Sequence, residues 1–396
     1  MSESPQTLGL YVSVPFCRAK CSFCNFASGV GSAGAVERYL ELLLGEIRGS
    51  RRAAAEKGIE LPGVVDTVYF GGGTPSSMEP EQMAAIFRVL RGEFAIADHA
   101  EITMEAAPGQ IGDTLLARAM DCGVNRVSLG VQSFVDREAQ AVGRSHTGDS
   151  CVAEIRRLHA AGLANVGADL IVGLPYQTKG SWEQSLEIAS SCGLEHLSVY
   201  MLEVDEESRL GREVLGGGAR LHAPAVPSDD LTADLYERAC ERLSLAGFAQ
   251  YEISNFATAG RCSQHNLKYW QRQPYLGFGL DAHSMLTTPE GEVLRWANAD
   301  ELSAYDGGSK LRAADRCSER EVFEEIVFLG LRLNEGLRQE QLRGFPRDWI
   351  TEFADGAQLL AGEGLMEIET GGWRLTRRGR LVSSAVFGEL LATVAA

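Results

Sequence analysis

The chain has 396 residues, of which 45% are hydrophobic and 23% charged, and its formal net charge is −17. At roughly 100–200 residues per domain this length predicts about two or three domains, and the composition is that of a globular protein with ample apolar material for a core. A surface this acidic repels phosphate, which disfavours non-specific binding to nucleic acid and binding to an anionic membrane surface.

The N-terminal segment and the hydropathy of the chain predict a cytoplasmic protein. The first residues lack the basic start of a signal peptide, and the apolar run that follows them stops at Cys17. No uninterrupted apolar run reaches the roughly 18 residues of a transmembrane helix. The nine cysteines are an odd number, and in a reducing compartment we do not expect them to form a disulfide framework.

Strand-like and helix-like patterns alternate over the first half of the chain. Short runs rich in β-branched residues, typical of strands, occupy 8–16, 64–72, 100–106, 125–132, 165–173 and 195–202. Apolar residues recur at helical spacing within 35–47, 79–92, 149–162 and 181–193, with Asp149 and Ser181 expected to begin the last two helices. This alternation predicts a parallel sheet, either doubly wound or closed toward a barrel, with its functional residues at the carboxyl ends of the strands.

The alternation fades after residue 203. The Gly- and Pro-rich stretch 215–230 predicts a loop, residues 231–247 a helix, and 287–293 a turn. The final block, from about residue 315, combines a helix over 320–333 with a hairpin and helix over 364–381. We therefore expect three units, namely a core over 1–205, an extension over 206–310, and a small α+β domain over 311–396.

Three of the nine cysteines form a cluster, C-x3-C-x2-C, directly after the first predicted strand: Cys17, Cys21 and Cys24. The other six are scattered singly and are expected to be ordinary thiols. A structural zinc site needs a fourth ligand, which here would have to be Cys262, His146 or His265. A cubane iron–sulfur cluster instead places one cysteine on each of three irons and leaves the fourth iron open to a small molecule.

Polar residues and glycines follow the other predicted strands. The segment FGGGTP, residues 70–75, exposes backbone groups at close range because glycine has no side chain. Glu105, Gln132 and Asp169 lie at the ends of the next strands, and Arg144 carries a planar guanidinium suited to a carboxylate. Each of these residues could be structural, but together they predict one site at the mouth of the sheet.

The cysteine motif and the glycine segment together resemble the radical S-adenosylmethionine (SAM) superfamily. The resemblance implies a [4Fe–4S] cluster held by Cys17, Cys21 and Cys24, whose open iron binds the amino and carboxylate groups of SAM. It also implies that SAM is contacted by Tyr11, Gly72, Gly73, Thr74, Glu105, Gln132, Arg144 and Asp169.

Residues 8–285 resemble the coproporphyrinogen dehydrogenase-like branch of that superfamily, which implies a partial (β/α)6 barrel followed by a small, mainly helical domain. In this branch the oxygen-independent coproporphyrinogen III oxidases carry a fourth cysteine where this chain has Phe26. The HemW-type haem chaperones carry phenylalanine there and an H-N-x-x-Y-W motif, which matches residues 265–270. One departure is Glu105-Ala106-Ala107-Pro108, where the branch commonly shows E-x-N-P.

The resemblance implies a haem chaperone that binds haem and SAM, delivers haem to haem proteins, and acts as a monomer or homodimer without catalytic residues of its own. His265 would then be a haem-binding residue, because imidazole is a good axial ligand for haem iron. Without the resemblance, the residues alone favour a His265 that forms hydrogen bonds within a covering loop, with Tyr269 and Trp270 packed in the core. Two other functions stay open: a radical SAM enzyme of porphyrin biosynthesis, such as the oxidase, and a binding protein that carries structural zinc.

Overall fold

The computed structural model describes residues 6–307 and 315–394. Over these residues twelve strands form one sheet, in the order β12-β11-β10-β9-β1-β2-β3-β4-β5-β6-β8-β7. The six strands predicted from the sequence are confirmed, and β1 to β6 pair in parallel: Leu8–Val14, Val64–Gly72, Ala95–Ala106, Arg126–Gln132, Val166–Val172 and His196–Met201.

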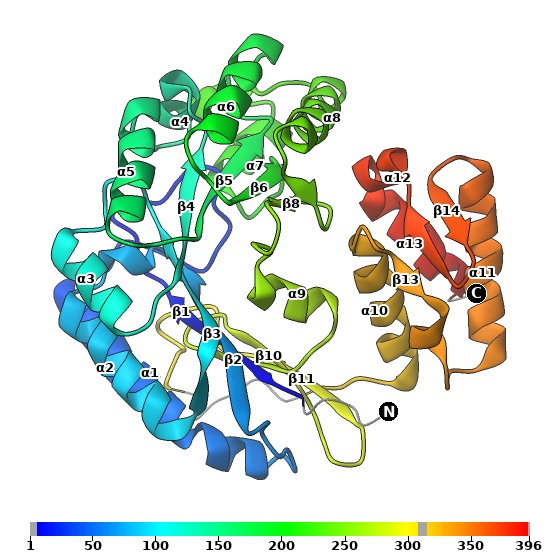
Figure 1. Cartoon of the computed structure of the whole chain (residues 1–396), viewed down its shortest axis with the longest axis horizontal. Helices are drawn as coiled ribbons and strands as arrows, with labels where there is room; N and C mark the ends of the chain where they lie inside the picture. The colour runs from blue at the N-terminus through cyan, green and yellow to red at the C-terminus, as the bar shows by residue number, and fades with distance from the viewer. Residues whose placement is uncertain (1–5, 308–314, 395–396) are drawn as a thin grey trace.

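Helices cover the outer face of these strands (Figure 1). The crossover helices are α1 to α6: Ala33–Ala55, Pro80–Glu93, Asp113–Asp121, Asp136–Ala141, Gly148–Ala160 and Lys179–Ser191, with the 3-10 helix η1 at Pro75–Ser77. Apolar side chains of α1 such as Leu43 and Ile47 are buried against the sheet. Because the strands are parallel and each is followed by a helix, the segments that leave them meet at one edge.

Two starts of helices differ from the prediction. Helix α5 begins at Gly148 with Thr147 as its N-cap, and α6 begins at Lys179 with Thr178 as its N-cap. In each case the threonine hydroxyl accepts from the backbone N–H of a serine three residues on, and that serine's hydroxyl in turn accepts from the cap N–H. This reciprocal box fixes the start of the helix upstream of Asp149 and Ser181.

The sheet continues beyond the six predicted strands on both sides. Strand β9, Tyr275–Phe278, runs parallel beside β1, and β10, His283–Thr287, β11, Val293–Ala297, and β12, Asp315–Arg316, follow it in antiparallel order. On the other side β8, Asn255–Ala257, and β7, Ala249–Gln250, extend β6. The terminal strands β12 and β7 are at opposite ends of the sheet order, so the barrel is open and the predicted partial barrel is confirmed.

The segment between β6 and β9 is mainly helical. It contains α7, Arg209–Leu215, the 3-10 helix η2, Arg220–Ala225, α8, Asp229–Leu245, and α9, Gln264–Trp270. The stretch 215–230 is therefore not wholly a loop, because η2 lies within it and α8 begins at Asp229. The helix predicted over 231–247 and the turn predicted over 287–293 are confirmed by α8 and by the β10–β11 hairpin.

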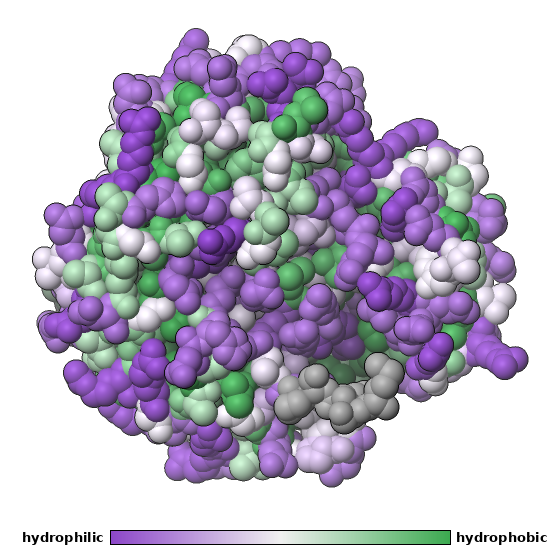
Figure 2. Space-filling view, in the orientation of Figure 1, coloured by the Kyte–Doolittle hydropathy of each residue, from purple (hydrophilic) through white to green (hydrophobic). Residues whose placement is uncertain are grey.

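The C-terminal block has a core of its own, to one side of the barrel (Figure 1). Its elements are α10, Glu319–Arg332, β13, Leu337–Arg338, η3, Gln339–Leu342, α11, Arg347–Gly362, β14, Met366–Glu369, β15, Gly372–Leu375, α12, Arg377–Leu381, and α13, Ser383–Val394. Hydrophilic residues dominate the visible face of the molecule, and a notch separates the two bodies (Figure 2). The boundary predicted between residues 310 and 311 lies outside the described residues, and the three-unit division remains a prediction.

Among the described residues, none of the helices is both long enough and apolar enough to cross a membrane.

Candidate functional site

The cysteine loop connects β1 to α1 and is anchored at its base. Its two ends are joined because Cys17 N donates to Gly29 O at 2.9 Å and Gly29 N donates to Pro15 O at 3.0 Å. In the middle of the loop, Ser22 N donates to Val142 O at 3.2 Å. These backbone bonds fix the loop at the carboxyl end of β1, where functional residues were predicted.

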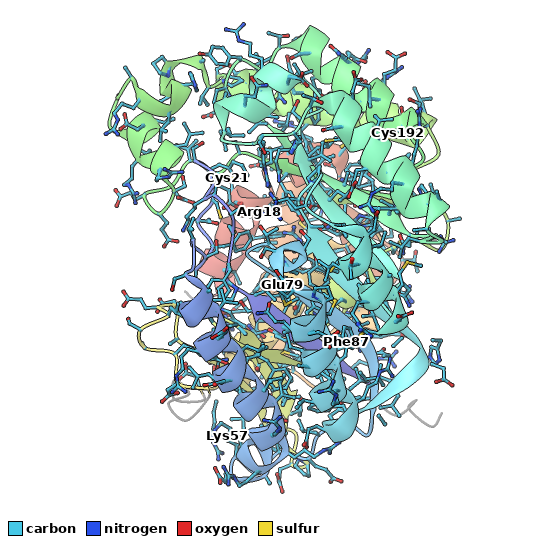
Figure 3. The ribbon with its side chains drawn as sticks, turned by 90° about the vertical axis from the view of Figure 1, so that its left-hand side faces the viewer. Arg18, Cys21, Lys57, Glu79, Phe87 and Cys192 are labelled. Carbon is cyan, nitrogen blue, oxygen red and sulfur yellow. The ribbon has the colours of Figure 1, made fainter. Side chains whose placement is uncertain are left out.

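A second set of contacts holds the loop from the side of α7. The Arg209 guanidinium donates to Lys20 O at 2.5 Å, and Leu210 N donates to Ser22 O at 2.8 Å. Asn25 Nδ2 donates to Asp205 Oδ2 at 3.2 Å. In Figure 3, Arg18 and Cys21 of the loop lie near the start of α1, and Lys57 lies just past the C-terminal end of that helix.

Polar groups from other elements lie beside the thiols of the loop. Burial raises the pKa of Cys21, the nearby Arg144 guanidinium lowers it, and negative charge on Cys24 or Cys17 would raise it further. The Thr74 hydroxyl donates to Cys17 Sγ at 3.4 Å. The charge of Arg144 therefore partly offsets the effect of burial on the pKa of Cys21, and the Thr74 hydroxyl stands beside the sulfur of Cys17.

The donor set of the loop fits an iron–sulfur cubane. Over residues 6–307 and 315–394, no three His, Cys, Asp or Glu side chains converge as the ligands of a single metal ion do. A cubane needs a different arrangement, because each of its cysteines binds a different iron. Hydrogen bonds to the sulfurs then help to set the reduction potential of the cluster. Three cysteines on one anchored loop, with Thr74 donating to Cys17, satisfy that need.

The glycine segment after β2 is packed so closely that side chains are excluded. Gly72 has φ +97°, and a Cβ built on it would lie 2.9 Å from Ser13 Oγ. A Cβ on Gly73 would lie 2.6 Å from Val14 O and 2.7 Å from Phe16 N. The absence of side chains thus lets the end of β2 pack directly against the end of β1, which keeps the backbone of the glycine segment beside the cysteine loop.

Two carboxylates, Glu105 on β3 and Asp169 on β5, face the interior of the barrel. Tyr69 OH donates to Glu105 Oε1 at 2.8 Å, and Ser128 Oγ donates to Asp169 Oδ1 at 3.2 Å. Burial, followed by the charge of Asp169, raises the pKa of Glu105 to about 7. Burial also raises the pKa of Asp169. Such paired, desolvated carboxylates are typical of binding sites.

Arg144 and Gln132 converge over Gly130. A Cβ on Gly130 would lie 2.9 Å from Arg144 Nη2 and 3.0 Å from Gln132 Nε2. Gln132 adopts φ +66° at an irregularity in the pairing of β4 with β5, which turns its side chain from the regular register. Arg144 Nε is buried without a hydrogen-bond partner among the described residues, and a bound carboxylate could accept from it.

His265 of α9 is buried against Tyr11 of β1 and Tyr69 of β2, and both of its ring nitrogens have partners. Nδ1 lies 2.8 Å from Thr67 Oγ1, and Nε2 lies 2.8 Å from Tyr269 OH. The ring stacks on Tyr69 and on Tyr11 with centroid separations of 5.2 and 6.5 Å. Burial, helped by the charges of Lys268 and Arg126, lowers its pKa to about 3, so this imidazole is neutral.

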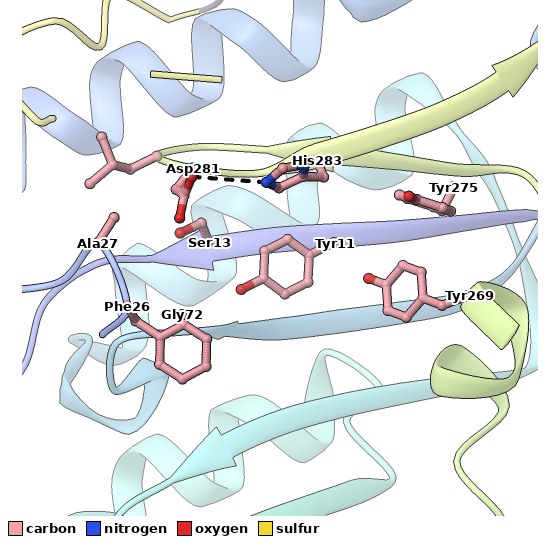
Figure 4. Close-up of a pocket in the computed structure, with 10 residues that line it drawn as sticks. Tyr11, Ser13, Phe26, Ala27, Gly72, Tyr269, Tyr275, Asp281 and His283 are labelled. Atoms are coloured by element: carbon pink, nitrogen blue, oxygen red, sulfur yellow. Dashed lines mark ion pairs between the residues drawn. The ribbon is translucent and has the colours of Figure 1, made fainter. Parts of the chain in front are cut away.

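A pocket of about 330 Å³ opens between the cysteine loop, β1, β9 and the turn before β10 (Figure 4). Its walls include Tyr11, Phe26, Tyr269, Tyr275, Asp281 and His283. Tyr11 and Gly72 also belong to the predicted SAM site, so the two sites adjoin. Tyr275 and Asp281 were not predicted as site residues, because the pairing of β9 with β1 brings Tyr275 here and the turn after β9 brings Asp281.

Known families match both parts of the chain. Residues 11–189 match the radical SAM superfamily, and residues 317–382 match the HemN C-terminal domain. The solved structure of HemN from Escherichia coli, titled a coproporphyrinogen III oxidase and radical SAM enzyme, aligns with a TM-score of 0.80 at 23% identity. The alignment covers 98% of this chain and 91% of that one, and at this identity it shows a shared fold.

Curated relatives match nearly the whole chain. The heme chaperone HemW of Bacillus subtilis is 33% identical over 96% of this chain and 98% of its own length. HemW of Mycobacterium tuberculosis is also 33% identical, over 98% of this chain and 95% of its own. The mitochondrial radical S-adenosyl methionine domain-containing protein 1 of Bos taurus is 32% identical over 98% of this chain and 88% of its own length. The chain therefore belongs to the HemW-type proteins of the radical SAM superfamily.

Proposed function

We propose that this protein is a haem chaperone, which binds haem beside an iron–sulfur cluster and delivers it to haem proteins. The observation that carries the proposal is the pocket next to the cysteine loop, whose aromatic walls offer flat apolar faces to a porphyrin. Relatives named heme chaperones, similar over nearly their full length, support the same conclusion. Phe26, in place of a fourth cysteine, is one of the pocket residues.

Cys17, Cys21 and Cys24 would hold the [4Fe–4S] cluster. When bound, the cluster supplies an open iron for a small molecule and a site for one-electron transfer. The anchored loop fixes the three sulfurs, and Thr74 donates a hydrogen bond to one of them. Val142 and α7 hold the loop from two sides, and the loop would in this way hold the cluster at the mouth of the barrel.

The interior of the barrel would hold SAM next to the cluster. Arg144 and Gln132 present N–H donors over Gly130 for the carboxylate of SAM. The N–H of Arg144 Nε has no acceptor among the described residues, so this group would be able to donate to that carboxylate. Glu105 and Asp169 would accept from ammonium and hydroxyl groups. Tyr11 and Gly72, which line the haem pocket, would contact SAM as well, together with Gly73 and Thr74.

His265 would belong to the haem site through Tyr269, whose hydroxyl it contacts and whose ring lines the pocket. We further propose that the protein works in the cytoplasm, as a monomer or homodimer. The alternative function is an oxygen-independent coproporphyrinogen III oxidase or a related enzyme. It is favoured by the fold shared with HemN, although Phe26 replaces the fourth cysteine typical of those oxidases.

Hemin titration and transfer test the proposed function. The cluster-reconstituted protein should bind hemin with a saturable change in the Soret band at about one haem per chain. When it is mixed with apomyoglobin, the spectrum of myoglobin should appear. A titration without saturation, like that of hemin with an unrelated acidic protein, would contradict haem carriage.

A further inference from the structure

We propose that His283, rather than the buried His265, is the axial ligand of the haem iron, and that Asp281 positions its imidazole. This inference rests on the proposed haem binding and names the residue that performs it. Of the seven histidines in the chain, all within the described residues, His283 alone lines the pocket.

His265 is poorly placed to bind an external iron. Its side chain is only 1% exposed, and each ring nitrogen already has a hydroxyl partner at 2.8 Å. Ligation through Nε2 would break the contact with Tyr269 and leave Tyr269 OH without its partner. The geometry instead gives His265 a positioning role, since it fixes the ring of Tyr269 that forms the pocket wall.

His283 has the opposite properties. It is the first residue of β10, its side chain is 68% exposed, and the ring faces the pocket opposite Tyr11 (Figure 4). Its Nε2 lies 3.9 Å from Asp281 Oδ1. A carboxylate beside a ligating imidazole orients the ring and increases its basicity, and rotation about the Cβ–Cγ bond determines which nitrogen faces the iron.

The turn that carries Asp281 and His283 is held by a buried polar network. The Glu46 carboxylate accepts from Gly279 N at 2.8 Å and from Asn298 Nδ2 at 2.7 Å. Tyr39 OH accepts from Leu280 N at 3.1 Å. Both Glu46 and Tyr39 come from α1, the helix that directly follows the cysteine loop, so the loop and the turn are fixed to one element.

The backbone of the turn is also specialised. Gly279 has φ +92°, and Asp281 has φ +55°, a left-handed conformation that is uncommon for a residue other than glycine. Asp281 N donates to Ala299 O at 2.8 Å, and Asn298 N donates to Ala282 O at 2.9 Å. A strained and well-anchored turn that presents a carboxylate and an imidazole is typical of a preorganised ligand site.

The other donors in the pocket are less suited to haem iron. The phenols of Tyr11, Tyr269 and Tyr275 would have to ionise to bind ferric iron strongly, and burial raises the pKa of each. Their rings, with the 61% exposed ring of Phe26, are better suited to contact the porphyrin faces. The pocket is open to solvent on one side, which would leave part of the porphyrin accessible for transfer.

The test compares ferric hemin complexes of the wild type, His283→Ala, His283→Cys and a control, His99→Ala, which removes an exposed histidine of β3. Electron paramagnetic resonance and resonance Raman spectra report the axial ligand directly. We expect H283A to lose the histidine signature and to regain it with added imidazole. We expect H283C to show a thiolate-ligated spectrum, and H99A to match the wild type. Asp281→Asn should weaken hemin binding by about 10- to 100-fold.

The outcomes separate this inference from the proposed function. If the wild type binds no hemin, the proposed function itself fails. If the wild type binds hemin and H283A and H283C retain its spectrum, His283 is not the ligand although haem carriage stands. A further variant, His265→Gln, tests the buried histidine. If H265Q loses the histidine signature while it keeps a normal cluster content, and H283A has an unchanged spectrum, the ligand is His265 and the inference is wrong.

Discussion

At the scale of single residues, the site combines groups that the fold holds in unfavourable surroundings. Glu105 is a carboxylate with a pKa of about 7, and Arg144 has a buried guanidinium nitrogen without a partner among the described residues. Gln132 has a positive φ. Each feature costs folding free energy in the free protein, and a polar ligand would satisfy the Glu105 carboxylate and the Arg144 nitrogen. This is the pattern expected where residues are selected for binding rather than for stability.

The cysteines give the first prediction at this scale. Replacement of Cys17, Cys21 or Cys24 by alanine should abolish the [4Fe–4S] cluster, because each thiolate binds a separate iron. Cys122→Ala, which removes a scattered half-buried thiol, should retain it. Iron and acid-labile sulfide analysis after anaerobic reconstitution measures the result. Retention of a full cluster in C21A, or one bound zinc in a colourless wild type, would contradict the assignment.

Glu105 gives a prediction about pH. Because its pKa is raised from 4.5 to about 7 in the folded state, the folded protein binds more protons between these values, so the stability of the apo-protein falls as pH rises through this window. At about pH 4, the free energy of unfolding of Glu105→Gln should therefore equal that of the wild type. Above about pH 7, the variant should be more stable than the wild type by roughly 1–3 kcal/mol. Urea unfolding at a series of pH values measures the difference.

Glu60→Gln, a change of an exposed carboxylate, is the matched control and should show no such pH-dependent gain. If E105Q and the wild type differ by the same amount at every pH, Glu105 does not titrate in this window. E105Q should also bind SAM more weakly, because an amide replaces an acceptor for cationic groups.

At the scale of elements, the hydrophobic patterns of the sequence predicted the six parallel strands. Because these strands are parallel, Glu105, Gln132 and Asp169 could be predicted to lie together at the carboxyl edge of the sheet. The patterns did not predict β9, because four residues give too little alternation and the strand is recognised only by its pairing with β1 and β10. Tyr275 was missed for that reason. Asp281 was missed because its role depends on the turn that Glu46 holds from a distant helix. Such contacts between segments far apart in sequence leave no local signal.

The close approach of β1 and β2 gives a prediction for the glycine segment. Gly73→Ala should lower the free energy of unfolding by about 1–3 kcal/mol and weaken SAM binding, because its Cβ would collide with the backbone of Val14 and Phe16. The control is Gly92→Ala in α2, where a Cβ meets nothing within 4 Å and should stabilise the helix by up to about 1 kcal/mol. Equal effects of the two changes in a thermal or urea unfolding series would argue against close packing at Gly73.

At the scale of the whole molecule, the C-terminal block is joined to the barrel by an ion pair between a buried carboxylate and a partly exposed arginine. Glu252 is fully buried, and its Oε2 lies 2.7 Å from Arg332 Nε of α10. The Arg332 guanidinium also lies over the ring of Trp270, 4.2 Å from its centroid, and so reaches the H-N-x-x-Y-W helix α9. The block therefore supports α9, and through Tyr269 one wall of the haem pocket.

This contact predicts that Arg332→Ala destabilises the protein by about 3–5 kcal/mol, because it leaves the Glu252 carboxylate buried without its cation. The double variant R332A/E252Q should recover part of this loss, since the remaining amide carries no charge. Urea unfolding measures both, and hemin binding should weaken in R332A alone. A loss below about 1 kcal/mol in R332A would mean that the pair behaves like an exposed salt bridge.

The measurement that tests the account most directly is an anaerobic incubation of the cluster-reconstituted protein with SAM, a reductant and either coproporphyrinogen III or hemin. A haem chaperone should bind about one hemin per chain, release it to an apo-acceptor, and form no protoporphyrinogen beyond the background without protein. Formation of protoporphyrinogen over many turnovers would contradict the account and identify the protein as an oxidase.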